Sequence, residues 1–184
     1  MLKWLGYDTD EVLTFNAKRV CGLWFCMIGL VISSATIFGG NMSLNPFIFA
    51  PGYAIGFIIS HNRKMEARLS TGPSSAFQNK IGNLAIVSMF VLMIFISGPF
   101  FISMNWRMIW LGTLLATGLH FFPFYFVVGK SMIFIGTLCT ISAVLGMILI
   151  DVPFMFFGIA DGFIKISFGI YLFFFSKPST NRIK

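Results

Sequence analysis

Residues 154–176 read FMFFGIADGFIKISFGIYLFFFS, an apolar stretch with two charged residues, Asp161 and Lys165, in its middle. A charge at the bilayer centre costs about 2.5–3.5 kcal/mol on insertion scales, so two unpaired charges cost about 5–7 kcal/mol. The apolar residues contribute about 0.3–0.6 kcal/mol each or less, and their sum nearly cancels that cost. The stretch therefore inserts poorly as a transmembrane helix unless its two charges avoid lipid.

The spacing of the two charges supplies a way to avoid lipid. Residues four apart share one helix face, and Asp before Lys is the favourable order. Gly158, Gly162 and Gly169 fall on the same arc at 100° per residue, so the charged face is also the face for close helix packing. We therefore predict an interior-facing ion pair. This pair is the main clue to function, because charged residues inside a membrane usually have a functional role.

The composition of the whole chain predicts a membrane protein. Of 184 residues, 57% are hydrophobic and 10% are charged, whereas soluble domains carry about 25% charged residues. Apolar runs of about 20 residues recur along the length. We predict an all-α membrane protein, a six-transmembrane-helix bundle that forms a single polytopic membrane domain over residues 1–184. The predicted spans are about 20–38, 44–60, 81–103, 108–128, 131–150 and 154–176, with a cytoplasmic loop at 61–80.

The basic residues predict the orientation of this bundle. Of 13 Lys and Arg residues, only Arg107 falls in an outer segment and only Lys165 falls inside a span. The positive-inside rule then places the N-terminus and the C-terminus in the cytoplasm. Ahead of the first span, Asp8 followed by Glu11 resembles a capping box, which predicts a helix from about Thr9 into that span.

A second group of polar residues lies in the fourth predicted span. Thr113, Thr117 and His120 follow an i, i+4, i+7 pattern and form one stripe. At 1.5 Å per residue, His120 lies about 18 Å below the outer edge and Lys165 about 16 Å, close to the bilayer midplane at about 15 Å. We predict that Asp161, Lys165, His120, Thr117 and Thr113 form a substrate or ion pathway. The alternative is that His120 only packs within the bundle.

Two prolines mark further positions of interest. Pro51 and Pro123 lack an amide donor, which frees the carbonyls of Phe47 and Leu119. Freed carbonyls are tolerated in a membrane only where protein or a watery cavity satisfies them. We therefore predict helix-break carbonyl sites at Phe47 and Leu119.

Motifs for catalysis and cofactors are lacking in this sequence. It contains no GxSxG or HExxH motif and no convincing pair of nucleophile and base, so we predict no catalytic residue and no enzyme activity. Cys21, Cys26 and Cys139 lie within apolar spans without ligand spacing, which predicts neither a metal site nor a cofactor.

The predicted partner of the chain is the lipid bilayer. Arg63, Lys64 and Arg68 either bind anionic lipid headgroups or only anchor the topology. The net charge of +7 does not indicate nucleic acid, since the basic residues fall where topology requires them. A membrane-protein partner or a homo-oligomer is left open.

Three stretches carry a resemblance to a known family. Residues 45–53 (NPFIFAPGY), 69–73 (LSTGP) and 118–124 (GLHFFPF) resemble a family of small six-helix bacterial integral membrane proteins whose function is unknown. The resemblance covers most of the chain. It implies a multi-pass location in a bacterial plasma membrane and attaches no activity.

Two functional hypotheses follow. The leading one is a small-solute or proton-coupled transporter, or a transporter membrane subunit, with a polar site at the midplane. The alternative is a non-transporting partner-binding protein, of the immunity or assembly factor type, in which the Asp/Lys pair is structural. A water-accessible cavity at His120 favours the first, and a fully packed core favours the second.

Overall fold

The computed structural model describes residues 12–182, and helices make up most of them. Two three-residue strands, β1 (Val12–Thr14) and β2 (Thr180–Arg182), flank the helical part. Short 3-10 turns η2 (Gly40–Met42) and η3 (Gly98–Phe101) and a π-helical turn η4 (Tyr171–Phe175) complete the elements. The α-helices are α1 (Lys18–Ile37), α2 (Pro46–Ser60), α3 (Arg63–Leu69), α4 (Ala76–Ser97), α5 (Trp106–His120), α6 (Tyr125–Val128), α7 (Ser131–Ile148) and α8 (Phe154–Ile170).

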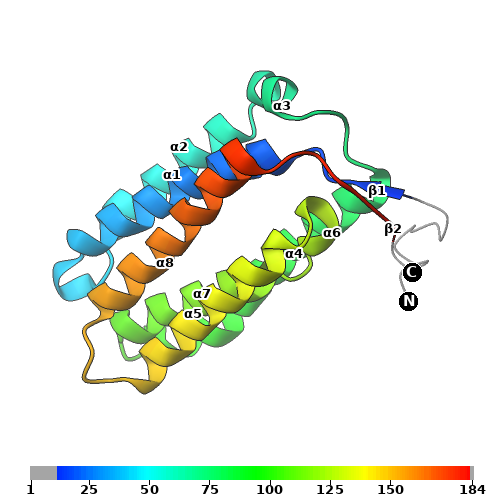
Figure 1. Ribbon diagram of the computed structural model, residues 1–184. Coiled ribbons are helices and arrows are strands. Elements are labelled where there is room, and N and C mark those ends of the chain that lie inside the picture. The colour runs from blue at the N-terminus through cyan, green and yellow to red at the C-terminus, as the bar shows by residue number, and fades with distance from the viewer. Residues whose placement is uncertain (1–11, 183–184) are drawn as a thin grey trace.

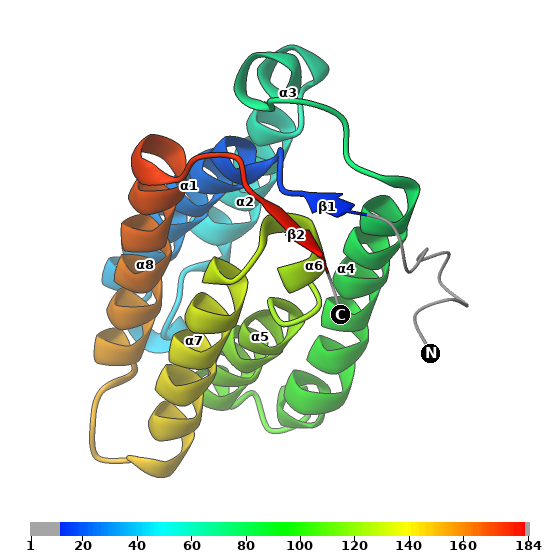
Figure 2. The same cartoon turned by 45° about the vertical axis from the view of Figure 1, so that its right-hand side comes forward.

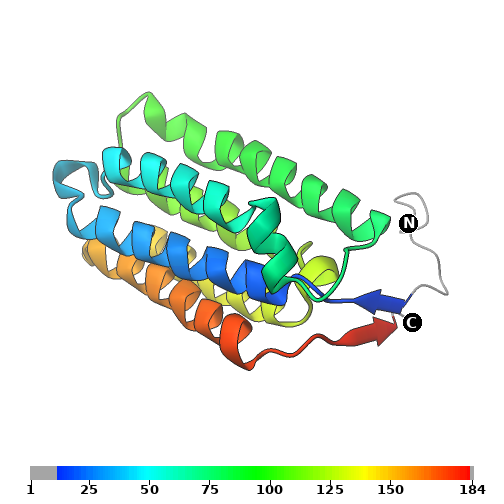
Figure 3. The same cartoon turned by 90° about the horizontal axis from the view of Figure 1, so that it is seen from above.

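The six longer helices run back and forth in two layers. Helices α2, α1 and α8 form one layer, α4, α5 and α7 form the other, and α7 packs on α8 where the layers join (Figure 1, Figure 3). The connections at residues 38–45, 98–105 and 149–153 lie at one end of the bundle (Figure 1). The strands, α3 and α6 lie at the other end (Figure 1). We call this the basic end, because it carries every described Lys and Arg position except Arg107 and Lys165.

The space between the layers is filled with apolar side chains. Phe25 of α1 meets Phe121 edge to face with 5.2 Å between ring centres, and Met132 and Ile135 of α7 are fully buried. The outside of the bundle is apolar too, as Ile94 is 68% exposed. Four helices, α1, α4 with η3, α7 and α8 with η4, are long and apolar enough to cross a membrane. An apolar exterior around such helices is typical of a membrane protein.

Glycines let α1 and α8 approach closely. A Cβ atom on Gly29 would lie 2.6 Å from the carbonyl oxygen of Gly162, and one on Gly169 would lie 2.7 Å from the backbone nitrogen of Cys26. Real Cβ atoms do not approach backbone atoms so closely, so no larger residue fits without moving a helix. The predicted close-packing face of residues 154–176 is therefore used, and its partner is α1.

The fourth predicted span ends earlier than expected. Helix α5 stops at His120, and a turn separates it from α6, whereas the prediction ran to residue 128. Pro123 disfavours helical geometry in the residue before it, which explains the break. Because the chain turns here, the carbonyl oxygen of Leu119 accepts a hydrogen bond from the Phe122 amide at 3.3 Å. The carbonyl of Leu119, which Pro123 cannot bond, is thus satisfied within the turn.

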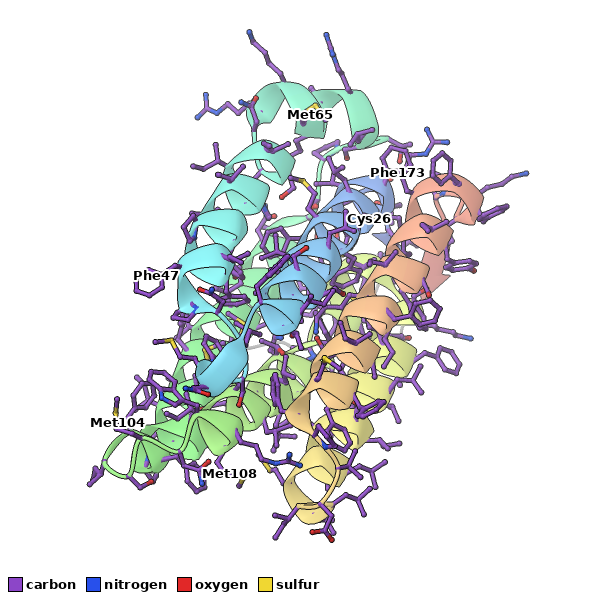
Figure 4. All side chains as sticks on the ribbon, turned by 90° about the vertical axis from the view of Figure 1, so that its left-hand side faces the viewer. Cys26, Phe47, Met65, Met104, Met108 and Phe173 are labelled. Carbon is purple, nitrogen blue, oxygen red and sulfur yellow. The ribbon has the colours of Figure 1, made fainter. Side chains whose placement is uncertain are left out.

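The second predicted span contains a continuous helix. Helix α2 passes through Pro51 without a break and begins at an Asn45 cap, whose side chain accepts a hydrogen bond from the Phe47 amide at 2.9 Å. Phe47 points away from the bundle (Figure 4) and is 78% exposed. Residue 47 thus lies in the first turn of α2, on the outer face.

The N-terminal segment forms a strand rather than the predicted helix. The predicted start near Thr9 lies outside the described residues, but residues 12–14 form β1 and α1 begins only at Lys18. Strand β1 pairs antiparallel with β2, with Leu13 opposite Asn181, so residues 12–14 and 180–182 lie side by side near α4 and α6 (Figure 2). The amide of Phe15 extends this pairing to the carbonyl oxygen of Ser179 at 2.9 Å.

A buried glutamine fixes this pair of strands to the bundle. The side-chain amide of Gln78 donates to the carbonyl oxygens of Thr14 at 3.0 Å and Phe126 at 3.1 Å. Gln78 also completes a capping box with Ser75 at the start of α4. We call β1, β2 and Gln78 the terminal clasp. It joins residues 12–14 and 180–182 to each other, to α4 and to the segment of α6.

Candidate functional site: the buried charge pair

The predicted ion pair is formed inside the bundle. Lys165 Nζ donates to Asp161 Oδ2 along α8, four residues apart. Asp161 is 1% exposed and Lys165 is 3% exposed, so neither charge faces lipid or water. Helix α8 presents both charges beside Gly158 and Gly162, which also lie buried. The arrangement removes the insertion cost that two lipid-facing charges would carry.

Two residues from the opposite layer complete the surroundings of Lys165. Its Nζ atom lies 3.9 Å from the Sγ atom of Cys139 on α7 and 5.8 Å from the centre of the Phe121 ring. Cys139 is 0% exposed and Phe121 is 4% exposed. An ammonium group over an aromatic face gains electrostatic attraction, more so when it is desolvated. A carboxylate, a thiol and an aromatic face therefore hold the lysine in place.

Asp161 is only half satisfied. Its Oδ2 atom accepts from Lys165, but its Oδ1 atom is buried without a hydrogen-bond partner among the described residues. The hydroxyl oxygens of Thr36 on α1 and Thr140 on α7 are also buried and unpartnered within residues 12–182. Leaving a buried carboxylate oxygen unpaired is costly, so such atoms are uncommon in folded proteins. Oδ1 is therefore the oxygen of this pair that is left able to accept a proton or a hydrogen bond.

His120 lies near the ion pair but does not join it. Its Nδ1 atom is hydrogen-bonded to the carbonyl oxygen of Thr117. The His120 ring lies 4.4 Å from that of Phe121 and 5.6 Å from that of Phe124, measured between centres. Phe121 thus contacts both His120 and Lys165. Within residues 12–182, His120 makes no hydrogen bond to either charged residue.

The two threonines of the predicted stripe bond to their own helix. Thr117 Oγ1 donates to the carbonyl oxygen of Leu114 at 2.8 Å, and Thr113 Oγ1 donates to that of Ile109 at 2.9 Å. Thr113 Oγ1 also lies 3.3 Å from the hydroxyl of Ser97 on α4. Such bonds are the usual way for hydroxyls to be satisfied in apolar helices. Thr113 therefore faces α4, and neither threonine is directed at Asp161.

Cys139 was missed as a member of the site. The sequence marks it only as a small residue in an apolar span. Counting from Ile150 at 1.5 Å per residue, however, it lies about 16 Å deep, the same depth as Lys165. The signal that could have identified Cys139 is therefore its depth in the membrane, which matches the depth of Lys165. Within residues 12–182 no three His, Cys, Asp or Glu side chains lie close enough together to hold a metal ion.

Comparison with known proteins places the chain in a family. Residues 8–182 match a family described as "Family of unknown function (DUF6609)". The match includes α8 with both charged residues, as well as Cys139 and Phe121. No curated protein and no solved structure matches the chain.

Proposed function

The chain belongs to DUF6609, a family of unknown function. We therefore propose its function from the buried charge pair. The protein is a small-solute or proton-coupled transporter, or the membrane subunit of one. The proposed setting is a bacterial plasma membrane crossed six times, with both termini in the cytoplasm. The single observation that carries the proposal is Asp161, which is 1% exposed and has one carboxylate oxygen unpartnered among the described residues.

Helix order and charge support the proposed topology. Helices α2 and α5 are 15 residues each, about 22 Å long at 1.5 Å per residue. That is shorter than the roughly 30 Å hydrocarbon core, yet both helices run between the same two ends as their longer neighbours (Figure 1). The basic end corresponds to the cytoplasmic side under the positive-inside rule. Arg107, the basic exception at the other end, donates to the carbonyl oxygens of Val152 and Gly146, both at 2.7 Å.

The chemistry of the pair supports coupling to protons. With both groups ionised, Asp161 and Lys165 together carry no net charge. A proton taken up at Oδ1 neutralises the carboxylate, weakens its hold on the ammonium and leaves the site with one positive charge. A site that becomes positive on protonation favours an anionic solute, because burial strengthens the attraction between charges. Proton and solute anion then bind together, which is the requirement for coupled movement.

Flux measurements on reconstituted protein test this proposal. Purified protein is placed in liposomes that contain a pH-sensitive dye, and small anions are added outside under an imposed pH gradient. We expect at least one anion to accelerate the change in dye signal in liposomes with the parent protein. Liposomes with folded Asp161→Asn/Lys165→Met protein should show no such acceleration. The matched control is Lys80→Gln, which changes an exposed lysine on α4. Transport that survives in the folded double variant would remove the pair from the mechanism.

One observation favours the alternative, a membrane protein that binds a partner and in which the Asp161–Lys165 pair only stabilises the fold. Phe25, Phe121 and Cys139, which fill the region around the pair, are 1%, 4% and 0% exposed, so this part of the core is tightly packed. Under this alternative the double variant keeps its function. Cross-linking in native membranes distinguishes the two, since a partner-binding protein gives a discrete adduct that persists in the double variant.

A further inference from the structure

A groove opens between α7 and α8 at the basic end of the bundle. The first turn of α7 and the last turn of α8 leave a volume of about 440 Å³ there. Its lining combines one lysine and two serine hydroxyls with three aromatic rings. The lining residues are Lys130, Ser131, Phe134, Ser167, Phe168 and Tyr171.

The polar groups of this groove are not used by the fold. Within residues 12–182, the side chains of Lys130, Ser131 and Ser167 make no hydrogen bond or ion pair. Lys130 and Ser167 are exposed, and Ser131 is half-buried. A cation and two hydroxyls on facing helices thus remain free to bind one anionic group between them.

Among the residues that the structure describes, Lys130 also forms no ion pair with an acidic residue. The carboxylates among the described residues are Glu66 on α3, Asp151 at the opposite end and Asp161, which is paired in the core. Within residues 12–182, the positive charge of Lys130 is therefore not neutralised by an ion pair. An anion is the occupant that matches it, and hydroxyl donors together with a lysine suit a phosphate oxygen.

The aromatic residues specify the rest of the occupant. Phe134 is 64% exposed and Tyr171 is 49% exposed on the outer surface of the helices. Tyrosine at such a position is typical of the level of lipid headgroups. We infer that this groove binds one anionic phospholipid, with its phosphate on Lys130, Ser131 and Ser167 and the start of its acyl chains against Phe134 and Phe168.

Lipid titration of the purified full chain in a neutral detergent tests the inference. Phosphatidylglycerol and phosphatidylcholine with identical acyl chains are added separately, and native mass spectrometry counts bound lipid. We expect saturable binding of one phosphatidylglycerol and much weaker binding of phosphatidylcholine. Lys130→Gln should weaken phosphatidylglycerol binding about fivefold, the amount expected for one basic residue near an anionic lipid.

Two further variants make the test specific. Lys80→Gln removes another exposed lysine of the basic end without touching the groove, and should leave binding unchanged. Ser167→Leu fills the groove and should weaken binding while Lys130 is retained. Equal losses in Lys80→Gln and Lys130→Gln would overturn the inference, because they indicate diffuse attraction. So would full competition by inorganic phosphate, which indicates an ion site rather than a lipid site. Transport by the Asp161 site is a separate question, and neither result depends on it.

Discussion

Removing one partner of the Asp161–Lys165 pair should destabilise the protein more than removing both. Lys165→Met keeps the length of the side chain and removes its charge, which leaves the Asp161 carboxylate buried without its one hydrogen-bond partner among the described residues. Asp161→Asn keeps the shape of the carboxylate and leaves the Lys165 ammonium uncompensated. The double variant Asp161→Asn/Lys165→Met removes both charges.

The magnitude follows from burial. Asp161 is 1% exposed and Lys165 is 3% exposed, so solvent screens the interaction little. Breaking a buried pair by removing one partner costs about 3–5 kcal/mol. Each single variant should lose free energy of unfolding in this range, a large part of the roughly 5–15 kcal/mol typical of a folded domain. The double variant should lose less than either single variant, since no uncompensated charge remains.

Unfolding by denaturant in mixed micelles measures these free energies, with retention on size exclusion as a check of folding. Lys80→Met is the matched control, because Lys80 is exposed on α4, and it should change stability by no more than about 0.5 kcal/mol. Losses that add in the double variant would refute the reasoning, since additivity means that the two groups do not interact. Single variants as stable as the parent would show that the charges are hydrated.

Three further predictions concern the fold around the site. Arg107→Leu removes hydrogen bonds to the carbonyl oxygens at the end of α7 and should lower the free energy of unfolding by about 2–4 kcal/mol. Arg107→Lys, which keeps the charge and one donor group, should lose less, and a loss below about 0.5 kcal/mol in Arg107→Leu would contradict the role of the hydrogen bonds. Gly162→Ala should lower the thermal midpoint because its Cβ would lie 2.8 Å from the backbone carbonyl oxygen of Gly29 on α1. Gly98→Ala, with nothing within 4 Å, should not. Gln78→Leu should speed hydrogen exchange in the terminal clasp while leaving exchange in α7 unchanged, and unchanged exchange at Thr14 would refute the clasp.

The ion pair was predictable because its signal is local. Asp161 and Lys165 lie four residues apart in an apolar stretch, so they share one face of a single helix. Exposing either charge to lipid is costly, and this cost together with the spacing predicts that they pair. The glycines on the same face predicted close packing by the same periodicity, and α1 is the helix that packs there. Neither inference requires knowing which helices are neighbours in space.

The rest of the site depends on helix neighbours that spacing does not reveal. Cys139 and Phe121 come from α7 and from the turn after α5, and only the packing of the two layers brings them to Lys165. His120 was expected at the same depth as Lys165, but depth alone does not fix which side of the helix faces the pair. Its ring lies beyond Phe121 instead.

The terminal clasp illustrates a different difficulty. Leu13 pairs with Asn181, far along the chain, so no local pattern reveals the partner of such a short strand. The capping signal at Asp8 and Glu11 predicted a helix that runs through residues 12–14. These residues form a strand instead, because they pair with residues 180–182. Gln78 shows the same effect, since its capping box is local and readable, but its bonds to Thr14 and Phe126 depend on the tertiary fold.

The most direct test of the central claim, that the buried pair is the solute site, is a ligand-dependent shift in thermal unfolding. Purified parent protein and the folded Asp161→Asn/Lys165→Met variant are screened side by side against small anions at several pH values. We predict that an anion which raises the parent's unfolding midpoint leaves that of the double variant unchanged. The same upward shift in both proteins would place solute binding elsewhere and contradict the claim.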